Sequence, residues 1–231
     1  MRVLCIGDSV TFGGVQTDQQ QTYPYDLQKD LNQRSHGHYE VLNESTGGWA
    51  LANEEGYISK FGVYNSQIVV EEIGTNDLTQ PFAPENTVGT ISYPDHKPLL
   101  GLQELVMRYI LPRVAPTLFN VTDPGVNIHQ NISQFKANLA IIRKMKKDVN
   151  ADGAKMVVIF MKQPTFSEPT NPTTVFEEHT LFKTLTDLNI PFISPSAEFI
   201  KEGDANLFRD GVHPNPLGDK LMAKSVATLI P

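Results

Sequence analysis

The sequence predicts an α/β protein, a three-layer α/β/α sandwich in which a central parallel sheet of about five strands lies between two layers of helices. Two observations lead to this prediction. Short apolar runs alternate with longer amphipathic segments along most of the chain, which is the pattern of right-handed βαβ units. One of these runs, Lys155–Met161 (KMVVIFM), is almost continuously apolar, as expected of a parallel strand that is buried on both faces.

The predicted strands are short apolar runs that end at turn-forming residues. The first covers residues 3–6 (VLCI) and stops at Gly7, and the third covers residues 67–73 (QIVVEEI) and stops at Gly74. Residues 39–42 form the second strand, Lys155–Met161 the fourth, and residues 191–193 the fifth.

Helices are predicted where apolar residues recur at a spacing of three or four. In Tyr23–Arg34 the positions Tyr23, Leu27 and Leu31 follow this spacing, and Pro24 suits the first turn. The next helix begins after Asn131 or Ser133, either of which can cap it, and ends near Asp152. Two further helices are predicted over residues 175–188 and 217–230.

Residues 79–131 interrupt the alternation of strands and helices. This segment is rich in proline and contains one convincing helical stretch, at about residues 99–114. A segment of this length outside the βα units is usually a functional loop, a lid or an interface insertion. We therefore expect residues 1–231 to form a single domain with an insertion at about residues 79–131.

Composition excludes several classes of protein. The 231 residues carry 19 Lys and Arg against 26 Asp and Glu, a net charge of −7, with no basic run, which argues against nucleic acid or an anionic membrane as the main partner. The single cysteine, Cys5, excludes an intrachain disulfide and a multi-cysteine zinc site. No apolar run approaches the ~20 residues of a membrane span. The first apolar run is too short for a signal peptide, so we expect a cytoplasmic protein, or a secreted one whose signal peptide is absent from this chain. The oligomeric state stays open.

Polar residues gather in four loops that follow the predicted strands or precede the last helix. They are residues 7–13, 43–49, 74–77 and 210–215. In an open parallel sheet, ligands bind beyond the carboxyl ends of the strands, so these loops are the expected place for a site.

Three of these residues suit nucleophilic catalysis. The hydroxyl of Ser9 is a weak nucleophile until a base takes its proton. His213 is a suitable base because imidazole changes its charge near neutral pH, and Asp210 can accept the other ring N–H and so fix the tautomer. The backbone N–H of Ser9, the backbone N–H of Gly48 and the side-chain amide of Asn76 are candidate donors to a developing oxyanion.

The four loops together resemble the SGNH hydrolases, also called GDSL-type esterases and lipases. Gly7-Asp8-Ser9-x-Thr11-x-Gly13 is similar to the block that carries the family's nucleophile, and Gly74-Thr75-Asn76-Asp77 to the block whose Asn donates to the oxyanion. Asp210-x-x-His213-Pro214 is similar to the last block, which carries the remaining triad members. Gly48 stands five residues after Asn43, where the family has its oxyanion glycine, although Ser45 replaces the preceding glycine. The resemblance implies the flavodoxin-like SGNH fold and these catalytic roles.

Each candidate also has a structural interpretation. Ser9 can cap a helix, Asp8 is better explained as a turn or cap residue, and Asn76 can be a turn amide. His36 and His38 lack a nearby carboxylate or cysteine and suit a solvated turn better than a metal site. Four loops in the family's order favour catalysis over these alternatives.

We therefore expect a serine carboxylester hydrolase that needs no metal and no cofactor. Its partner would be a small-molecule ester, and the polar insertion favours short acyl chains, such as acetyl groups on carbohydrates. Two alternatives stay open: an acyltransferase that uses the same triad with a sugar alcohol in place of water, and a non-catalytic binding module on this fold. A nucleotide-binding protein is disfavoured because no phosphate-binding glycine motif follows the first strand.

Overall fold

The computed structural model describes residues 1–14, 17–34, 38–81, 99–110, 114, 132–164 and 172–231. The chain divides into two compact units, one made of residues 1–82 and 128–231 and the other of residues 83–127. In the smaller unit the structure describes a helical turn, α4 (Gly101–Glu104), followed by a π-helical segment, Leu105–Ile110. The predicted helical stretch at residues 99–114 is therefore helical over residues 101–110. Most of the predicted insertion lies outside the described residues, and its role within a single domain stays a prediction.

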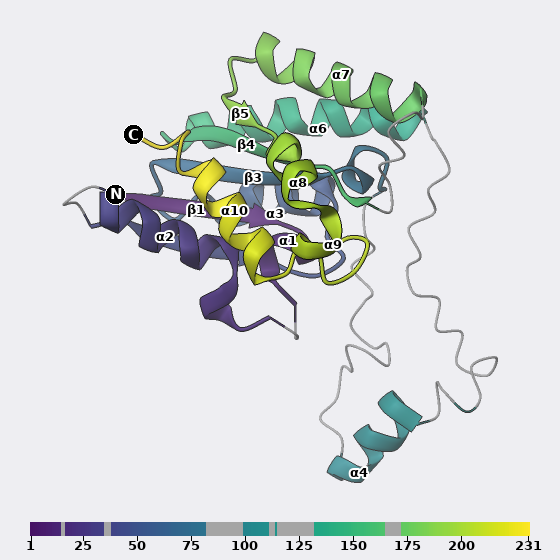
Figure 1. Ribbon diagram of the computed structural model, residues 1–231. Coiled ribbons are helices and arrows are strands. Elements are labelled where there is room, and N and C mark those ends of the chain that lie inside the picture. The colour runs from purple at the N-terminus through teal and green to yellow at the C-terminus, as the bar shows by residue number, and fades with distance from the viewer. Residues whose placement is uncertain (15–16, 35–37, 82–98, 111–113, 115–131, 165–171) are drawn as a thin grey trace. The chain divides into compact units, whose positions relative to one another are not determined.

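A five-stranded parallel sheet forms the centre of the larger unit and confirms the predicted fold class (Figure 1). The strands lie in the order β2-β1-β3-β4-β5, so the order reverses beside β1. Their bounds are Arg2–Gly7 for β1, Glu40–Ser45 for β2, Ile68–Gly74 for β3, Lys155–Met161 for β4 and Phe192–Ile193 for β5. Register places Gly7 opposite Ser45, and Gly74 opposite Met161, so these strands end together at one edge of the sheet.

Helices cover both faces of the sheet. Residues of α2 (Tyr23–Arg34) and α10 (Pro216–Val226) pack with Val3, Cys5 and Val70 on one face. Residues of α3 (Leu51–Phe61), α6 (Ile132–Ala151) and α7 (Pro172–Asp187) pack on the other. Each strand thus sends alternate side chains into two separate cores.

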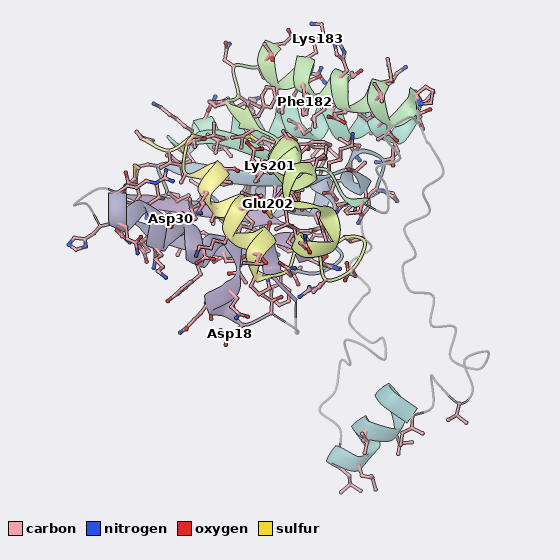
Figure 2. The ribbon with its side chains drawn as sticks, in the orientation of Figure 1. Asp18, Asp30, Phe182, Lys183, Lys201 and Glu202 are labelled. Atoms are coloured by element: carbon pink, nitrogen blue, oxygen red, sulfur yellow. The ribbon has the colours of Figure 1, made fainter. Side chains whose placement is uncertain are left out.

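The α7 helix illustrates how an amphipathic pattern selects its buried side. Phe182 packs edge-on against Phe160 of β4, with ring centroids 5.4 Å apart. Its neighbour Lys183 projects outward (Figure 2) and pairs with Asp187 one turn later. The apolar stripe that predicted the helix is therefore the stripe that the sheet buries.

The structure also contains helical elements that the sequence pattern did not predict. They are α1 (Ser9–Phe12), η1 (Gln19–Gln21), α3, η2 (Asn76–Leu78), α8 (Ser196–Glu202) and α9 (Asp204–Leu207). Among the described residues, no helix is both long enough and apolar enough to cross a membrane.

Candidate active site

The turn between β1 and α1 presents Ser9 at the carboxyl end of β1. Asp8 caps α1, because its Oδ1 accepts the N–H of Val10 over 2.7 Å. Gly13 ends the helix in the left-handed region, at φ +82°. Gly7 leaves no room for a side chain, since a Cβ there would lie 2.4 Å from Thr11 Oγ1. The Gly-Asp-Ser sequence therefore forms the tight turn that the close packing requires.

Ser9, His213 and Asp210 form one continuous chain of hydrogen bonds. His213 Nε2 lies 2.9 Å from Ser9 Oγ, although the two residues are 204 positions apart. His213 Nδ1 lies 2.9 Å from Asp210 Oδ2 and 3.1 Å from Oδ1. The structure thus brings together the three residues that the sequence selects as a triad.

Hydrogen bonds that the Asp210 carboxylate accepts from backbone N–H groups of the same loop stabilise the loop that carries Asp210 and His213. Asp210 Oδ1 accepts the N–H of Val212 over 2.8 Å and that of His213 over 2.7 Å. Burial raises the pKa of Asp210, but hydrogen bonds from these two N–H groups and from the His213 side chain outweigh it, so the pKa lies below its usual value. Asp210 is therefore a carboxylate at neutral pH, which favours the proton on Nδ1 and leaves Nε2 free to accept from Ser9.

Gly48 lies in the loop after β2 in a backbone conformation that suits glycine. Its φ is +81°, a region that other residues rarely adopt, and it is exposed. Within the described part of the chain, neither the N–H of Gly48 nor that of Ser9 has a hydrogen-bond acceptor. Both donors remain available to a bound oxyanion.

Asn76 begins η2 at the carboxyl end of β3, and its amide has a partner that the sequence did not predict. One hydrogen of Nδ2 goes to Gln80 Oε1 over 2.8 Å. Gln80 Nε2 in turn donates to the carbonyl of Trp49 over 3.1 Å. Since Nδ2 carries two hydrogens, one still remains for an oxyanion. Gln80 was missed because only the folded chain brings it against the loop of Gly48.

Two more buried amides hold the turn that carries Asn76. Gln163 Oε1 accepts the backbone N–H of Asn76 over 3.1 Å. Asn138 Nδ2, from α6, donates to the carbonyls of Asp77 over 2.7 Å and Gln80 over 2.9 Å. Both amide side chains are at most 2% exposed, so they replace water as partners of this turn.

Cys5 and Trp49 take structural places in the two cores. Cys5 is fully buried, and burial raises the pKa of its thiol to about 12, which makes it unreactive. Trp49 packs against Tyr57, with ring centroids 5.4 Å apart. His36 lies outside the described residues. Among the described residues, no group of three or more His, Cys, Asp or Glu side chains has the arrangement of a metal site.

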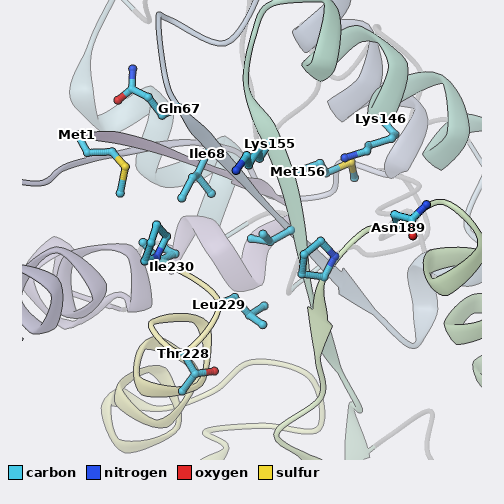
Figure 3. A pocket seen from close by; sticks show the side chains of 13 residues that line it. Met1, Gln67, Ile68, Lys146, Lys155, Met156, Asn189, Thr228, Leu229 and Ile230 are labelled. Carbon is cyan, nitrogen blue, oxygen red and sulfur yellow. The ribbon is translucent and has the colours of Figure 1, made fainter.

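A pocket of about 660 Å³ lies elsewhere in the fold (Figure 3). It is lined by residues at the amino ends of the strands, including Ile68, Lys155 and Met156, together with Leu229 and Ile230 near the carboxyl terminus. Ser9, Asp210 and His213 do not line it. It is thus distinct from the candidate active site, which lies at the opposite ends of the strands.

Comparison with solved structures finds the same fold at low sequence identity. An acetyl xylan esterase, AlAXEase, is 17% identical with a TM-score of 0.62, and 100% of each chain is covered. A lipase/acylhydrolase from Enterococcus faecalis is 15% identical with a TM-score of 0.61, over 100% of this chain and 95% of that one. The psychrotrophic esterase EstA from a Pseudoalteromonas species is 14% identical with a TM-score of 0.57, over 98% and 94%.

No curated protein matches the chain. The model of the GDSL-like lipase/acylhydrolase family, however, matches residues 5–221, which include all four loops that the sequence analysis singled out. That match covers most of the chain, and the α/β fold agrees with it, so the chain belongs to the GDSL-like lipase/acylhydrolase family.

Proposed function

We propose that this protein is a serine carboxylester hydrolase in which Ser9 is the nucleophile, His213 the base and Asp210 the residue that orients it. The observation that carries this proposal is the hydrogen-bond chain from Ser9 Oγ through both ring nitrogens of His213 to Asp210. A serine beside a correctly oriented base is the arrangement that acyl transfer needs.

In the acylation step, His213 Nε2 takes the proton of Ser9 Oγ as that oxygen attacks the ester carbonyl. The carbonyl oxygen becomes an oxyanion, which the N–H groups of Ser9 and Gly48 and the amide of Asn76 stabilise. Asp210 stabilises the imidazolium that forms. The carbon–oxygen bond to the alcohol then breaks, and the alcohol leaves with the proton from His213.

The same groups then hydrolyse the acyl-enzyme. His213 takes a proton from water, the hydroxide attacks the acyl carbonyl, and Ser9 Oγ leaves with the proton from His213. All proton transfers in this scheme use side chains of the chain itself, so it calls on no metal or cofactor.

Short acyl esters, including acetyl groups on carbohydrates, are the substrates that we propose. The acetyl xylan esterase with the same fold supports this choice, as do the polar residues of the segment at 79–131. Turnover of a series of aryl esters from acetyl to longer chains tests it. Faster turnover of the long chains would contradict the proposal.

Labelling with a fluorophosphonate, which reacts with activated serines, tests the catalytic assignment. We expect one label on the wild-type protein, located at Ser9 by peptide mass spectrometry, and none on Ser9→Ala. Ser45→Ala is the matched control, because Ser45 ends the neighbouring strand and its hydroxyl donates to Asn43 Oδ1. Full labelling of Ser9→Ala, or no labelling of the wild type, would show that Ser9 is not the nucleophile and would favour a binding module.

Product analysis separates hydrolysis from transfer. With an aryl acetate in water we expect free acetate as the acyl product, and an added sugar alcohol should not divert most of it to a new ester. A predominant sugar ester would instead identify an acyltransferase.

A further inference from the structure

The side chain of Arg209 joins the loop of His213 to the segment that follows α1. Arg209 Nη1 donates to the carbonyl of Gly13 over 3.1 Å and to the hydroxyl of Thr17, which lie 196 and 192 positions away in the sequence. Nη2 faces Gly14, where a Cβ would lie 3.3 Å from it. The guanidinium therefore fits closely against the chain just beyond the carboxyl end of α1.

The backbone of Arg209 belongs to a hairpin, residues 207–215, that carries the triad acid and base. The N–H of Arg209 donates to the carbonyl of His213 over 3.0 Å, and the N–H of Asn215 donates to the carbonyl of Leu207 over 2.8 Å. These two hydrogen bonds join the arms of the hairpin on either side of His213. The position of the Arg209 side chain relative to His213 is thus set by the backbone.

The α1 helix depends on contacts from other parts of the chain. A helix of four residues is a single turn, and a helix this short is not stable in water without packing. Asp8 caps its amino end, and Asn43 of β2 donates to one of its carbonyls over 2.9 Å. At the carboxyl end, the N–H of Gly13 donates to the carbonyl of Ser9 over 3.0 Å, and the carbonyl of Gly13 accepts from Arg209. Arg209 therefore fixes the end of the turn that begins at the nucleophile.

Arg209 leaves the triad carboxylate free for His213. Its Nε is buried and lies 4.0 Å from Asp210 Oδ2, which is too far for a hydrogen bond, and it has no hydrogen-bond partner in the part of the chain that the structure describes. Asp210 Oδ2 instead pairs with His213 Nδ1 at 2.9 Å. The hydrogen bonds of the Arg209 side chain thus go to the α1 segment, while its charge lies beside the triad acid.

We propose that Arg209 is a positioning residue, whose guanidinium links the carboxyl end of α1 to the 207–215 hairpin and so keeps Ser9 Oγ within hydrogen-bond distance of His213 Nε2. This inference rests on the proposed role of Ser9 as nucleophile. Arg209 acts through the carbonyls of Gly13 and His213, not by contact with the substrate.

The first test compares the kinetics of Arg209→Met and Arg209→Lys with an activated acetyl ester. Methionine keeps the apolar stem and removes every donor, so kcat should decrease roughly 10- to 100-fold through misplacement of Ser9, with KM within about threefold of wild type. Lysine keeps the charge and a donor but not the planar fork, so its kcat should decrease only about three- to tenfold.

Arg143→Met is the matched control, because Arg143 donates to the Leu139 carbonyl within its own helix, α6. Its kcat should equal that of the wild type, and circular dichroism confirms that each variant is folded. A wild-type kcat in folded Arg209→Met would overturn the proposal, as would an equal decrease in Arg143→Met. If Arg209→Met does not fold, a wild-type kcat in Arg209→Lys would overturn it.

A second measurement does not depend on activity. The N–H of Gly13 closes the α1 turn by donating to Ser9, so its exchange with solvent reports opening of this turn. In Arg209→Met this amide should exchange about tenfold faster than in wild type, and in Arg143→Met at the wild-type rate. An unchanged rate in Arg209→Met would overturn the proposal. A wild-type protein without esterase activity would instead overturn the proposed function, and amide exchange would still test whether Arg209 holds α1.

Discussion

Asn76 Nδ2 donates a hydrogen bond of 2.8 Å to Gln80 Oε1. Through Gln80 Nε2, which donates to the carbonyl of Trp49, this contact links η2 after β3 to the loop after β2. Two of the three proposed oxyanion donors, the Asn76 amide and the Gly48 N–H, are thus held in register by a single side chain. Gln80 has no charge to lose and is only partly buried, so its contribution to catalysis can be separated from its contribution to stability.

Gln80→Ala should therefore reduce kcat by about tenfold, less than the ~10²–10³-fold loss expected for removing the Asn76 donor in Asn76→Ala. The freed Asn76 amide would rotate among several positions, and the Gly48 loop would lose its attachment. Initial rates with an activated acetyl ester, with Tm in parallel, check this. Gln20→Ala, at an exposed position of η1, is the control. A Gln80→Ala enzyme with wild-type kcat would show that the link is dispensable.

Asp210→Asn should lower kcat/KM by roughly 10³–10⁴-fold while leaving the fold intact. The amide oxygen of Asn can still accept the N–H groups of Val212 and His213, so the loop keeps its shape. What is lost is the negative charge that stabilises imidazolium. Kinetics on the activated ester together with unfolding by heat measure both effects. Activity within about tenfold of wild type would contradict the role of Asp210.

The sequence predicts best where a pattern depends on neighbouring residues alone. The fourth strand, β4, was predicted to the residue because Lys155–Met161 is buried on both faces and reads as one apolar run. The α3 helix was missed because Leu51–Phe61 contains Gly56 and two glutamates, one of which, Glu54, is buried. A buried glutamate hides the apolar stripe on which helix prediction relies.

The same limit applies to the candidate site, where the sequence predicts residues that lie in short motifs and misses contacts that depend on packing. Ser9, Asp210 and His213 were found because each lies in a short motif, and the folded chain brings these motifs into hydrogen-bond contact. The amide contacts of Gln80 and Asn138 were not predicted, since they join residues whose proximity depends on how α6 and the loop after β2 pack. No local pattern distinguishes such an amide from a solvated one.

Asn138→Leu should destabilise the protein by about 1–3 kcal/mol. Leucine has the same branching and the same number of side-chain heavy atoms, but it leaves the carbonyls of Asp77 and Gln80 without the amide that donates to them. Urea unfolding measures the loss, and Asn150→Leu, at an exposed position of the same helix, is the matched control. An equal effect of the two substitutions would indicate that the carbonyls find other partners.

The free energy of unfolding should decrease as the pH rises from mildly acidic to neutral. Burial raises the pKa of Asp219 to about 7 and that of Glu71 to about 8, whereas in the unfolded chain both ionise near their usual values. The folded state then binds more protons than the unfolded state, so its stability is greatest below the unfolded pKa values and is lost as the pH rises through the folded ones.

Asp219→Asn isolates one of these groups. Its amide oxygen can still accept the N–H of Tyr23, which Asp219 Oδ1 accepts over 3.1 Å, so the contact between α2 and α10 is kept. We expect the variant to lose less stability between about pH 4 and pH 7, with a slope shallower by up to about 1.4 kcal/mol per pH unit. Urea unfolding at a series of pH values measures both slopes, and Asp187→Asn, an exposed position on α7, serves as the control. Parallel slopes for the wild type and Asp219→Asn would mean that Asp219 is already ionised in the folded protein at acidic pH.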